Sequence, residues 1–341
     1  MHVTQKDIAR KLGISITTVS RALAGYSDVA EETRQRVLQT AQEMGYSPHL
    51  LARRLQKQRT DTIGFIMPTL APRFSDPFFS EFIAGVGNEA ASHEYDLLVS
   101  THPPESESEM KAYERAAKGG WVDGLIIVRT REKDERIRLL CQYKFPFVSF
   151  GRTNESLDFA YVDEDGETGI KLLTQHLIDL GHRRIGFIRP PKDMMAGHFR
   201  LQGFMKAMAE NDLPVRPEWI VEGDMTQRGG EQSMAVLLDV QPGITAVIAG
   251  NDLMAIGAMH CAQQRGLEVG KDISVAGFDD IPLAAYVKPS LTTLRQPIYE
   301  IGRMTCRMLI DLINGRFSHP PQVLLVPQLI IRSSTAPPAS D

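Results

Sequence analysis

Residues 4–23 of the chain read TQKDIARKLGISITTVSRAL, and this stretch predicts two short helices joined by a tight turn. Thr4 and Asp7 have the spacing of a capping pair, in which each side chain reaches a free amide at the helix start. Gly13 ends the first helix, and Ser15 is placed to cap the second. Two helices around a glycine turn are typical of a helix-turn-helix, whose second helix enters the major groove of DNA. The alternative is an ordinary pair of surface helices.

The residues that follow favour the helix-turn-helix. A third helix is predicted at about residues 30–44, because its apolar residues share one face and can close a small three-helix core. Residues 45–48, GYSP, end that helix. The next segment, residues 48–57, is only about ten residues long, and isolated helices of that length are marginal in water. We therefore expect it to be helical only when a partner holds it.

Charge is distributed unevenly along the chain. The whole sequence carries a net charge of −4, but residues 1–60 hold ten Lys and Arg against five Asp and Glu, a net of +5, which leaves −9 for the rest. A basic segment ahead of an acidic body fits phosphate binding by the first segment alone.

Cysteine usage and hydropathy bear on the compartment. Cys141, Cys261 and Cys306 are scattered without metal-site spacing, which predicts free thiols in a reducing environment. The N-terminus has no apolar core of a signal peptide, and no run of about 18 apolar residues could span a membrane. We therefore expect a cytoplasmic protein with no metal, cofactor or membrane partner.

Beyond residue 62, short apolar and β-branched runs alternate with amphipathic helical stretches. The predicted strands are residues 63–67, 97–99, 125–128, 147–150, 185–188, 246–249 and 273–278. The predicted helices between them include residues 79–92, 169–180, 201–211, 230–238 and 253–265. Such alternation indicates an α/β protein with parallel sheets covered by helices on both faces. The number of units exceeds what one small sheet needs and favours two lobes.

Polar and aromatic residues gather where these strands end, which is where open parallel sheets bind their ligands. They include Phe78, Phe79, Arg129, Arg152, Asn251 and Asp279. Aromatic rings, guanidinium groups and carboxylates together suit a polyhydroxylated molecule, because its ring stacks on the aromatics while its hydroxyls donate and accept hydrogen bonds.

Motifs of common enzyme classes are missing from the sequence. It contains no Gly-x-x-x-x-Gly-Lys-Ser/Thr loop, no Gly-x-Ser-x-Gly elbow and no His-Glu-x-x-His pair. Asp279 and Asp280 could serve acid–base chemistry, but no nucleophile or metal set accompanies them. We therefore predict a protein without catalytic residues.

Several short motifs occur together near the start of the chain: VT at 3–4 with DIA at 7–9, VSR at 19–21, VAEETR at 29–34, and GYSP at 45–48 with Ala52 and Leu55. On these motifs the chain resembles the LacI/GalR family of bacterial transcription regulators, and the resemblance extends to about Arg332. It implies a three-helix, helix-turn-helix head and a hinge helix, followed by a two-lobed effector domain of the periplasmic-binding-protein type I. Ala30 departs from the serine that relatives often carry there, so the third helix should start more weakly.

The resemblance also implies domain boundaries. The DNA-binding head would comprise residues 1–46, the hinge residues 47–60, and the effector-binding and dimerisation domain residues 61–341. Within that domain the expected N-lobe is 61–162 plus 292–322, the expected C-lobe is 163–291 plus 323–332, and a tail occupies 333–341. The sequence shows no repeat between the two lobes.

Sequence reading on double-stranded operator DNA is expected from the second helix. Ile16 can contact a thymine methyl, Thr17 can bond a base edge, and Arg21 can reach guanine or phosphate. One such helix covers few base pairs, which calls for a homodimer on a pseudo-palindrome. The tail lacks the leucine heptads of tetrameric relatives, which also favours a dimer.

The hinge adds a second set of expected DNA contacts. The resemblance implies that two hinge helices pair in the minor groove, where Leu55 wedges between base steps, a mode that trades unstacking for the contacts of bent DNA. Arg53, Arg54 and Lys57 would hold phosphates. The complete set of expected DNA-binding residues is Thr4, Ser15, Ile16, Thr17, Thr18, Ser20, Arg21, Tyr46, Pro48, Ala52, Arg53, Leu55 and Lys57.

The resemblance assigns an effector site to particular residues. Phe79, with Phe78 beside it, matches the ligand-stacking position, Arg200 matches the effector-anchoring arginine, and Asn251 and Asp279 match the polar clamp of sugar-binding members. Met225 stands where purine-binding members carry a second aromatic, which favours a mono- or oligosaccharide over a nucleobase. The complete set of expected effector-binding residues is Phe78, Phe79, Arg129, Arg152, Asp165, Arg200, Met225, Asn251 and Asp279.

Three functions remain open at this stage. The first is a transcriptional regulator, most simply a repressor, under allosteric control by a sugar-like effector, or in a variant by a nucleobase. The second is a solute-binding protein of a transporter, for which the basic head has no use. The third is a sugar-active enzyme, which would need turnover without a recognisable catalytic set.

Overall fold

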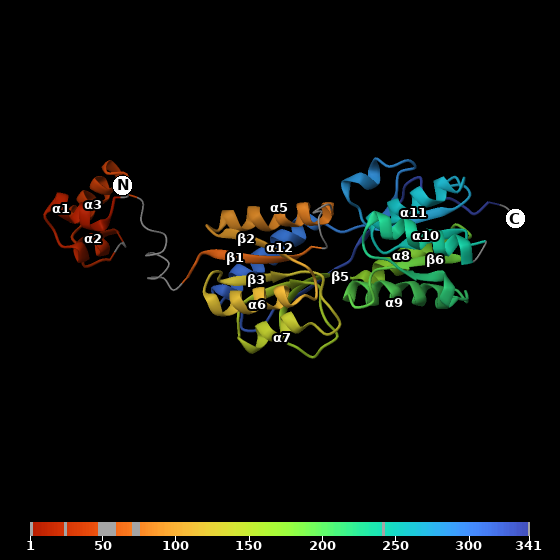
Figure 1. Ribbon diagram of the computed structural model, residues 1–341, viewed down its shortest axis with the longest axis horizontal. Helices are drawn as coiled ribbons and strands as arrows, with labels where there is room; N and C mark the ends of the chain where they lie inside the picture. Colours follow the sequence, from red (N-terminus) through yellow and green to blue (C-terminus); the bar gives the residue numbers. More distant parts are fainter. Residues whose placement is uncertain (1–2, 24–25, 47–58, 70–75, 241–242, 340–341) are drawn as a thin grey trace. The chain divides into compact units, whose positions relative to one another are not determined.

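The computed structural model describes residues 3–23, 26–46, 59–69, 76–240 and 243–339 of the 341-residue chain. The chain forms two compact units, Met1–Thr60 and Asp61–Asp341 (Figure 1). Among the described residues, no helix is both long and apolar enough to span a membrane.

The described residues of the first unit form three helices: α1 (Gln5–Leu12), α2 (Ile16–Leu23) and α3 (Glu31–Glu43). The backbone amide and the hydroxyl of Thr4 both donate to the Asp7 carboxylate, at 3.0 and 2.6 Å, which fixes the start of α1. Gly13 ends α1 in the left-handed region at φ +68°, a conformation that glycine adopts without strain. The Ser15 hydroxyl accepts from the Thr18 amide at 3.0 Å and so caps α2.

The core of this unit is small and comes from all three helices. It consists of Ile8 and Ala9 of α1, Val19 and Ala22 of α2, and Val37 and Ala41 of α3. The start of α3 is the weaker one that was expected, because Ala30 at the N-cap makes no side-chain hydrogen bond to the helix.

The second unit contains two six-stranded sheets, each in its own lobe. The first sheet has the order β11-β5-β4-β3-β1-β2, and all its strands are parallel. Its strands are β1 (Thr62–Pro68), β2 (Asp96–His102), β3 (Gly124–Ile127), β4 (Phe147–Phe150), β5 (Ala160–Glu164) and β11 (Gln322–Leu325). Helices α5 (Pro77–Ser92) and α12 (Ile298–Ile313) cover one face, and α6 (Glu107–Gly119) and α7 (Glu135–Gln142) cover the other (Figure 1).

The second sheet has the order β12-β10-β9-β8-β6-β7, with only β12 antiparallel to its neighbour. Its strands are β6 (Ile185–Arg189), β7 (Ile220–Glu222), β8 (Ala246–Ala249), β9 (Ser274–Asp279), β10 (Thr292–Arg295) and β12 (Gln328–Ile330). One face carries α8 (Gly166–Asp179) and α9 (Met195–Glu210), and the other carries α10 (Gln227–Val240) and α11 (Asp252–Gln264). The short helices η1 (Pro217–Trp219) and η2 (Pro282–Ala285) lie in loops.

Both lobes therefore repeat one strand order, although the sequence shows no repeat. In each lobe the first strand, β1 or β6, lies between the second and third strands of that lobe. The order in which successive strands are added to the sheet therefore reverses at this strand. Parallel pairing depends on buried apolar strands and short crossovers, which many different sequences provide.

Helices α5 and α12 pack unusually closely because glycines meet backbone on both sides. A Cβ atom at Gly85 of α5 would collide with the Tyr299 carbonyl of α12, and one at Gly302 of α12 would collide with the Phe82 carbonyl of α5. This contact fastens α12, which follows β10 of the second lobe in sequence, to the first lobe.

The lobe boundaries differ from the expected ones in three places. β5 keeps Asp163 and Glu164 in the first sheet, β10 pairs with β9 in the second sheet, and β11 pairs with β5 in the first. The expected division assigned residues 163–164 and 323–325 to the C-lobe and 292–295 to the N-lobe. Membership of a sheet depends on a partner strand distant in sequence, which local composition does not specify.

Helix α9 begins at Met195, six residues before the predicted start at 201. Arg200 therefore lies in the second turn and does not open the helix. Gly197 looks like a helix breaker in the sequence, but in the structure it is required inside α9, where a Cβ would collide with the Pro191 carbonyl.

Candidate functional site

The outer face of α2 is a polar and apolar surface suited to base edges. Ile16, Thr17 and Arg21 are exposed, with 47% of Ile16 accessible, while Val19 and Ala22 are buried in the core. This division follows helical periodicity, because residues three or four apart share a face. The three exposed side chains are thereby presented together without loss of core packing.

Arg21 is held in place by its neighbours. Its Nε donates to Asp28 Oδ1 at 3.2 Å, and its guanidinium lies 4.8 Å from the centroid of the Tyr26 ring. Both contacts are at the surface, so they orient the side chain and contribute little stability.

The remaining head residues in the expected DNA-binding set have structural roles as well. Thr4 and Ser15 cap helices, the hydroxyls of Ser15 and Thr18 share a hydrogen bond of 2.8 Å, and Tyr46 packs against the head core. Ser20 is half-buried. The expected hinge contacts Pro48, Ala52, Arg53, Leu55 and Lys57 lie outside the described residues.

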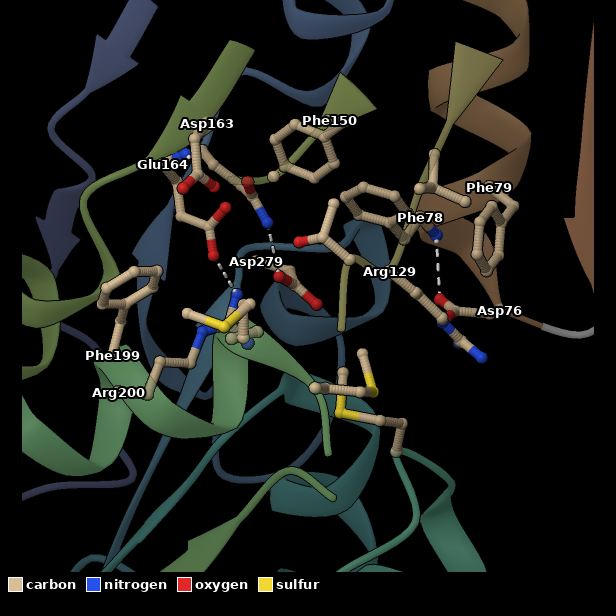
Figure 2. A pocket seen from close by; sticks show the side chains of 18 residues that line it. Asp76, Phe78, Phe79, Arg129, Phe150, Asp163, Glu164, Phe199, Arg200 and Asp279 are labelled. Carbon is tan, nitrogen blue, oxygen red and sulfur yellow. Dashed lines mark hydrogen bonds and ion pairs between the residues drawn. The ribbon is translucent and has the colours of Figure 1, made fainter. Parts of the chain in front are cut away.

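In the second unit a cleft opens between the two lobes (Figure 2). Its walls are the ends of β3, β4, β5 and β9, the first turns of α5 and α9, and the loop after β7. The carboxyl ends of parallel strands thus meet the amino ends of helices, as in other open α/β sheets.

The first-lobe wall is aromatic. The Phe78 ring stacks on Phe150 with centroids 5.7 Å apart and on Phe82 at 6.0 Å, and Phe79 meets Phe78 edge to face at 5.4 Å. Arg129 lies over the Phe79 ring, 4.9 Å from its centroid. These contacts fix the rings before any ligand arrives, which lowers the ordering cost of stacking a ligand on them.

The Arg129 guanidinium also faces a carboxylate, Asp76, at 3.4 Å. Asp76 caps α5 by accepting from the Phe78 amide at 3.1 Å. Burial raises the pKa of Asp76, and the positive charge of Arg129 opposes that rise.

Arg200 joins the two lobes at the base of the cleft. Its Nη2 donates to Glu164 Oε1 of the first lobe at 2.6 Å, and its Nη1 donates to the Gly250 carbonyl of the second. The guanidinium lies 3.7 Å from the centroid of Phe278, and only 4% of Arg200 is exposed. A buried charge in this position is tolerated because it is both paired and hydrogen-bonded.

Two further carboxylates line the cleft, Asp163 from the first lobe and Asp279 from the second. Burial, and then the charge of Glu164, raise the pKa of Asp163 well above its ordinary value. Burial likewise raises the pKa of Asp279, although Arg200 opposes the rise. Asp279 accepts a hydrogen bond from Gln296 Nε2 at 2.6 Å, and its φ of +118° is unusual for a residue other than glycine.

Backbone hydrogen bonds also connect the lobes beside the cleft. The Met195 amide donates to the Thr130 carbonyl at 2.9 Å, and the Glu132 amide donates to the Asp193 carbonyl at 3.1 Å. Arg131 and Met194 pair there as an antiparallel bridge. The loop after β3 therefore contacts the second lobe through main chain, independently of side-chain identity.

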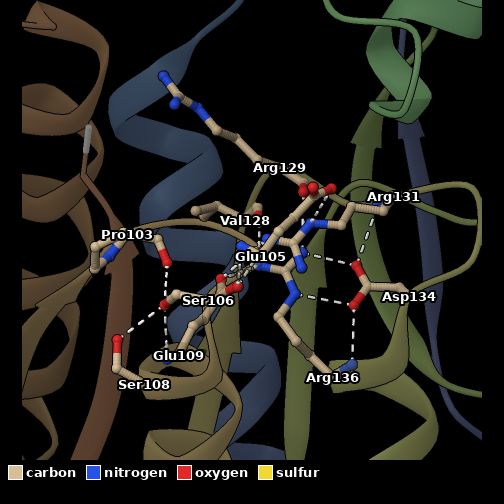
Figure 3. Close-up of polar contacts among 10 residues, drawn as sticks. All are labelled: Pro103, Glu105, Ser106, Ser108, Glu109, Val128, Arg129, Arg131, Asp134 and Arg136. Atoms are coloured by element: carbon tan, nitrogen blue, oxygen red, sulfur yellow. Dashed lines mark hydrogen bonds and ion pairs between the residues drawn. The ribbon is translucent and has the colours of Figure 1, made fainter.

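A buried ionic cluster holds that loop (Figure 3). Arg136 pairs with Asp134 at 2.7 Å and with Glu109 at 3.3 Å, and all three side chains are fully buried. Arg131 pairs with Glu109 at 2.8 Å, and Arg136 also donates to the Val128 and Arg129 carbonyls. Burial works to raise the pKa of Asp134, but hydrogen bonding and charge from Arg136 outweigh it, so the pKa is lowered.

Comparison with known proteins assigns both units. Residues 4–49 match the model for bacterial regulatory proteins of the lacI family, and residues 174–335 match the model for a periplasmic binding protein-like domain. The HTH-type transcriptional repressor CytR of Escherichia coli K12 is 35% identical over 332 residues, which cover 97% of this chain and 96% of that protein. The chain belongs to the LacI family. Like its relatives, it is a DNA-binding transcriptional repressor.

Solved structures of LacI-family proteins support the same fold. The transcriptional regulator CelR in complex with cellobiose aligns with a TM-score of 0.76 and 31% sequence identity, covering 98% of this chain and all of that one. The lac repressor dimer bound to operator and the anti-inducer ONPF aligns with a TM-score of 0.86 and 28% identity, covering 98% of this chain and all of that one.

In this LacI-family repressor, six of the nine expected effector residues line the cleft: Phe78, Phe79, Arg129, Arg200, Met225 and Asp279. Arg152 does not line it but lies close by, 4.0 Å from the centroid of the lining ring Phe199 and 3.5 Å from Asp163.

The other two, Asp165 and Asn251, are not among the lining residues. Asp165 caps α8 through the amide and hydroxyl of Thr168, at 3.0 and 2.7 Å. Asn251 caps α11 by accepting from the Met254 amide at 3.0 Å and donates to the Met225 carbonyl at 3.1 Å. The side-chain oxygens of Asp165 and Asn251 thus accept hydrogen bonds from amides at the starts of α8 and α11.

Sequence reasoning missed seven polar or aromatic residues among the described lining: Asp76, Thr130, Phe150, Asp163, Glu164, Phe199 and Gln296. For Asp163 and Glu164 a signal existed, because they end β5 in the run VDEDG, but the sequence does not show at which residue the strand stops. Gln296 lies in the crossover after β10, which was assigned to the wrong lobe. Within the described residues, no group of three or more His, Cys, Asp or Glu is placed to hold a metal ion.

Proposed function

We propose that this repressor binds a pseudo-palindromic operator as a homodimer and is controlled allosterically by a small sugar-like effector in the cleft between its lobes. Operator binding would place its action in the bacterial cytoplasm. The observation that carries the effector class is the lining of the cleft, where fixed phenylalanine rings face carboxylates and guanidinium groups. Rings bind the apolar faces of a sugar, and the charged groups bind its hydroxyls from both sides.

The second-lobe side of the cleft favours a sugar over a nucleobase. Met225 lines it in place of an aromatic residue, and the one phenylalanine that α9 contributes, Phe199, already has Arg152 against its ring. A planar base would therefore meet a Phe199 ring that already has a guanidinium group against it. The solved relative CelR, which binds cellobiose, supports the sugar reading.

Operator reading is assigned to Ile16, Thr17 and Arg21, since these side chains are exposed on one face of α2. A single helix contacts few base pairs, so two copies are needed for useful specificity, and a symmetric dimer reads a site with matching symmetry. The lac repressor structure, a dimer on operator, supports this arrangement.

Control would act through the hinge, residues 47–60. If effector binding changes the angle between the lobes, it changes the separation of the two hinge segments in the dimer. A segment of about ten residues is helical only while its partner and DNA hold it, so separation lowers operator affinity.

The test is selection of operator sequences from a pool of random duplex DNA, with Leu55→Ala and the neighbouring control Gln56→Ala in parallel. We expect the wild type and the control to enrich one palindrome, and Leu55→Ala to lose it. Enrichment of a site without two-fold symmetry would contradict dimeric reading. The enriched DNA then serves as the probe for sugars and nucleobases, and release or tightening by a nucleobase alone would contradict the sugar assignment.

A further inference from the structure

Among the described residues that line the cleft, carboxylates outnumber guanidinium groups. Four lining residues are acidic and two are basic. Arg129 is engaged by Asp76 at 3.4 Å and Arg200 by Glu164 at 2.6 Å, so each guanidinium has its own carboxylate. Asp163 and Asp279 remain, and the described lining residues offer them no further cation. Outside the lining, Arg152 lies 3.5 Å from Asp163.

Hydrogen-bond acceptors are also left over. Gln296 Oε1 is buried and accepts no hydrogen bond from any described residue, and Asp163 Oδ2 is contacted only by Arg152 Nε at 3.5 Å, beyond good hydrogen-bond geometry. Both residues are only 4% exposed. The Gln296 amide is oriented, because its Nε2 donates to Asp279 Oδ1 at 2.6 Å. Buried acceptors without a donor are rare in native proteins and usually mark a missing partner. One donor, Arg200 Nε, is unpartnered in the same way.

These acceptors come from three different parts of the fold. Asp163 ends β5 of the first lobe, Asp279 ends β9 of the second, and Gln296 follows β10 in the crossover between them. A ligand that donates to all three touches both lobes and the crossover at once. Recognition of these donors would therefore be linked to the relative position of the lobes.

We propose, building on the sugar-effector function above, that the effector is an uncharged sugar whose hydroxyls donate to Asp163, Asp279 and Gln296, and that the two carboxylates exclude phosphorylated and acidic sugars. A hydroxyl can donate to one of these oxygens and accept from Arg200 Nε. An ionised phosphate or carboxylate group in place of a hydroxyl offers acceptors and no donor. It would leave the protein acceptors at that position unpaired and bring like charges together.

The experiment is calorimetric titration of the full-length protein with a panel of uncharged mono- and disaccharides, each paired with its 6-phosphate or uronic acid. We expect at least one uncharged sugar to bind, and its charged counterpart to bind weaker by on the order of 100-fold, because juxtaposed like charges are costly. Adenine, hypoxanthine and their nucleosides complete the panel.

Two variants separate charge from hydrogen bonding. Asp163→Asn should lower the affinity for the uncharged sugar by about tenfold. It should also reduce the ratio of the affinities for the uncharged sugar and its charged counterpart. Gln296→Met should weaken the uncharged sugar but leave the exclusion of the charged one intact. Asp158→Asn is the matched control, because Asp158 is exposed, lies outside the cleft lining and loses the same charge. Thermal unfolding of each variant shows that it is folded.

The results of these titrations distinguish failure of the uncharged-sugar inference from failure of the sugar-effector function. A phosphorylated or acidic sugar that binds more tightly than its parent would overturn this inference and leave the sugar-responsive function standing. Unchanged discrimination in folded Asp163→Asn would overturn the role given to Asp163. Binding of a nucleobase with no binding by any sugar would overturn both.

Discussion

Arg200 shows how much of the second unit depends on one buried charge. It pairs with Glu164 across the lobes, donates to the Gly250 carbonyl and covers the Phe278 ring. Burying an ion pair costs solvation of both charges, so the pair itself adds little stability, but either partner alone is strongly unfavourable. The single side chain therefore serves both the packing of the lobes and the floor of the cleft.

We predict that Arg200→Met destabilises the protein by about 3–5 kcal/mol, because it leaves Glu164 buried without a counter-charge. Chemical denaturation measures the loss. The double variant Arg200→Met with Glu164→Gln should recover much of it, since no uncompensated charge then remains. A double variant less stable than the single one would show that the pair, and not the isolated charge, determines the effect.

Because the pKa values of Asp163 and Asp279 are raised, we predict that effector affinity decreases at acidic pH. Burial raises the pKa of both carboxyls in the unliganded cleft. Hydroxyls that donate to them favour the charged forms and so lower the pKa in the complex. Binding then releases protons, so affinity is complete above the unliganded pKa and declines as the pH falls through it. Titration with the bound sugar between pH 5 and pH 8 checks this, and Asp163→Asn should flatten the profile.

At the scale of elements, the loop between β3 and α7 is positioned by an ionic cluster to which its own Arg131 and Asp134 contribute. Glu109 of α6 holds both Arg131 and Arg136, and Asp134 caps α7 while it pairs with Arg136. The same loop pairs with residues 193–195 of the second lobe through main chain. An element of the first lobe thus determines where the lobes meet.

Glu109→Gln should therefore destabilise the protein by about 3–5 kcal/mol, because the buried Arg136 and the half-buried Arg131 lose the carboxylate they share. The matched control is Glu107→Gln in the same first turn of α6, because Glu107 is exposed and pairs with the exposed Lys111. That change should cost little, as surface pairs do. Thermal or urea unfolding compares the two, and equal losses would contradict the role assigned to the cluster.

In helix α2 the residues that pack in the head core and the residues expected to contact DNA are different. Thr17 is exposed and contacts no part of the head core, so Thr17→Ala should leave thermal unfolding of the head unchanged. Operator affinity should fall by about 1 kcal/mol or more, since a base-edge contact is lost. Gel-shift or fluorescence titration with the selected operator measures it. Gln39→Ala, at an exposed position of α3, is the control. An equal loss of operator affinity in this variant would argue against base reading by Thr17.

At the scale of the whole molecule, DNA and effector act on one chain through two compact units. Thermodynamic linkage requires their effects on one another to be reciprocal. If a sugar changes operator affinity by a given factor, saturating operator must change sugar affinity by the same factor, typically about 5- to 150-fold in allosteric proteins. Paired titrations test this, and an effector that leaves operator affinity unchanged would contradict allosteric control.

Much of the fold could be predicted because its signals are local. The capping pair Thr4 and Asp7, the turn at Gly13 and the spacing of Val19 and Ala22 are contained within a few residues of each other. Buried strands such as β4 and β8 were placed to the residue, because a short apolar run between turn residues has few other interpretations. Residues that line the cleft could be named where resemblance and strand ends agreed, as for Phe79 and Asp279.

The sequence by itself therefore determined the helix-turn-helix, the α/β alternation and the kind of chemistry gathered at the strand ends. Only the tertiary structure decided which lobe receives β10 and β11, that Asp165 and Asn251 serve as caps, and that Asp163 and Gln296 face the cleft. The physical reason is range. Caps, turns and helical faces depend on neighbours within one or two turns, whereas sheet membership and the direction of a buried side chain depend on strands that pair across more than a hundred residues of chain.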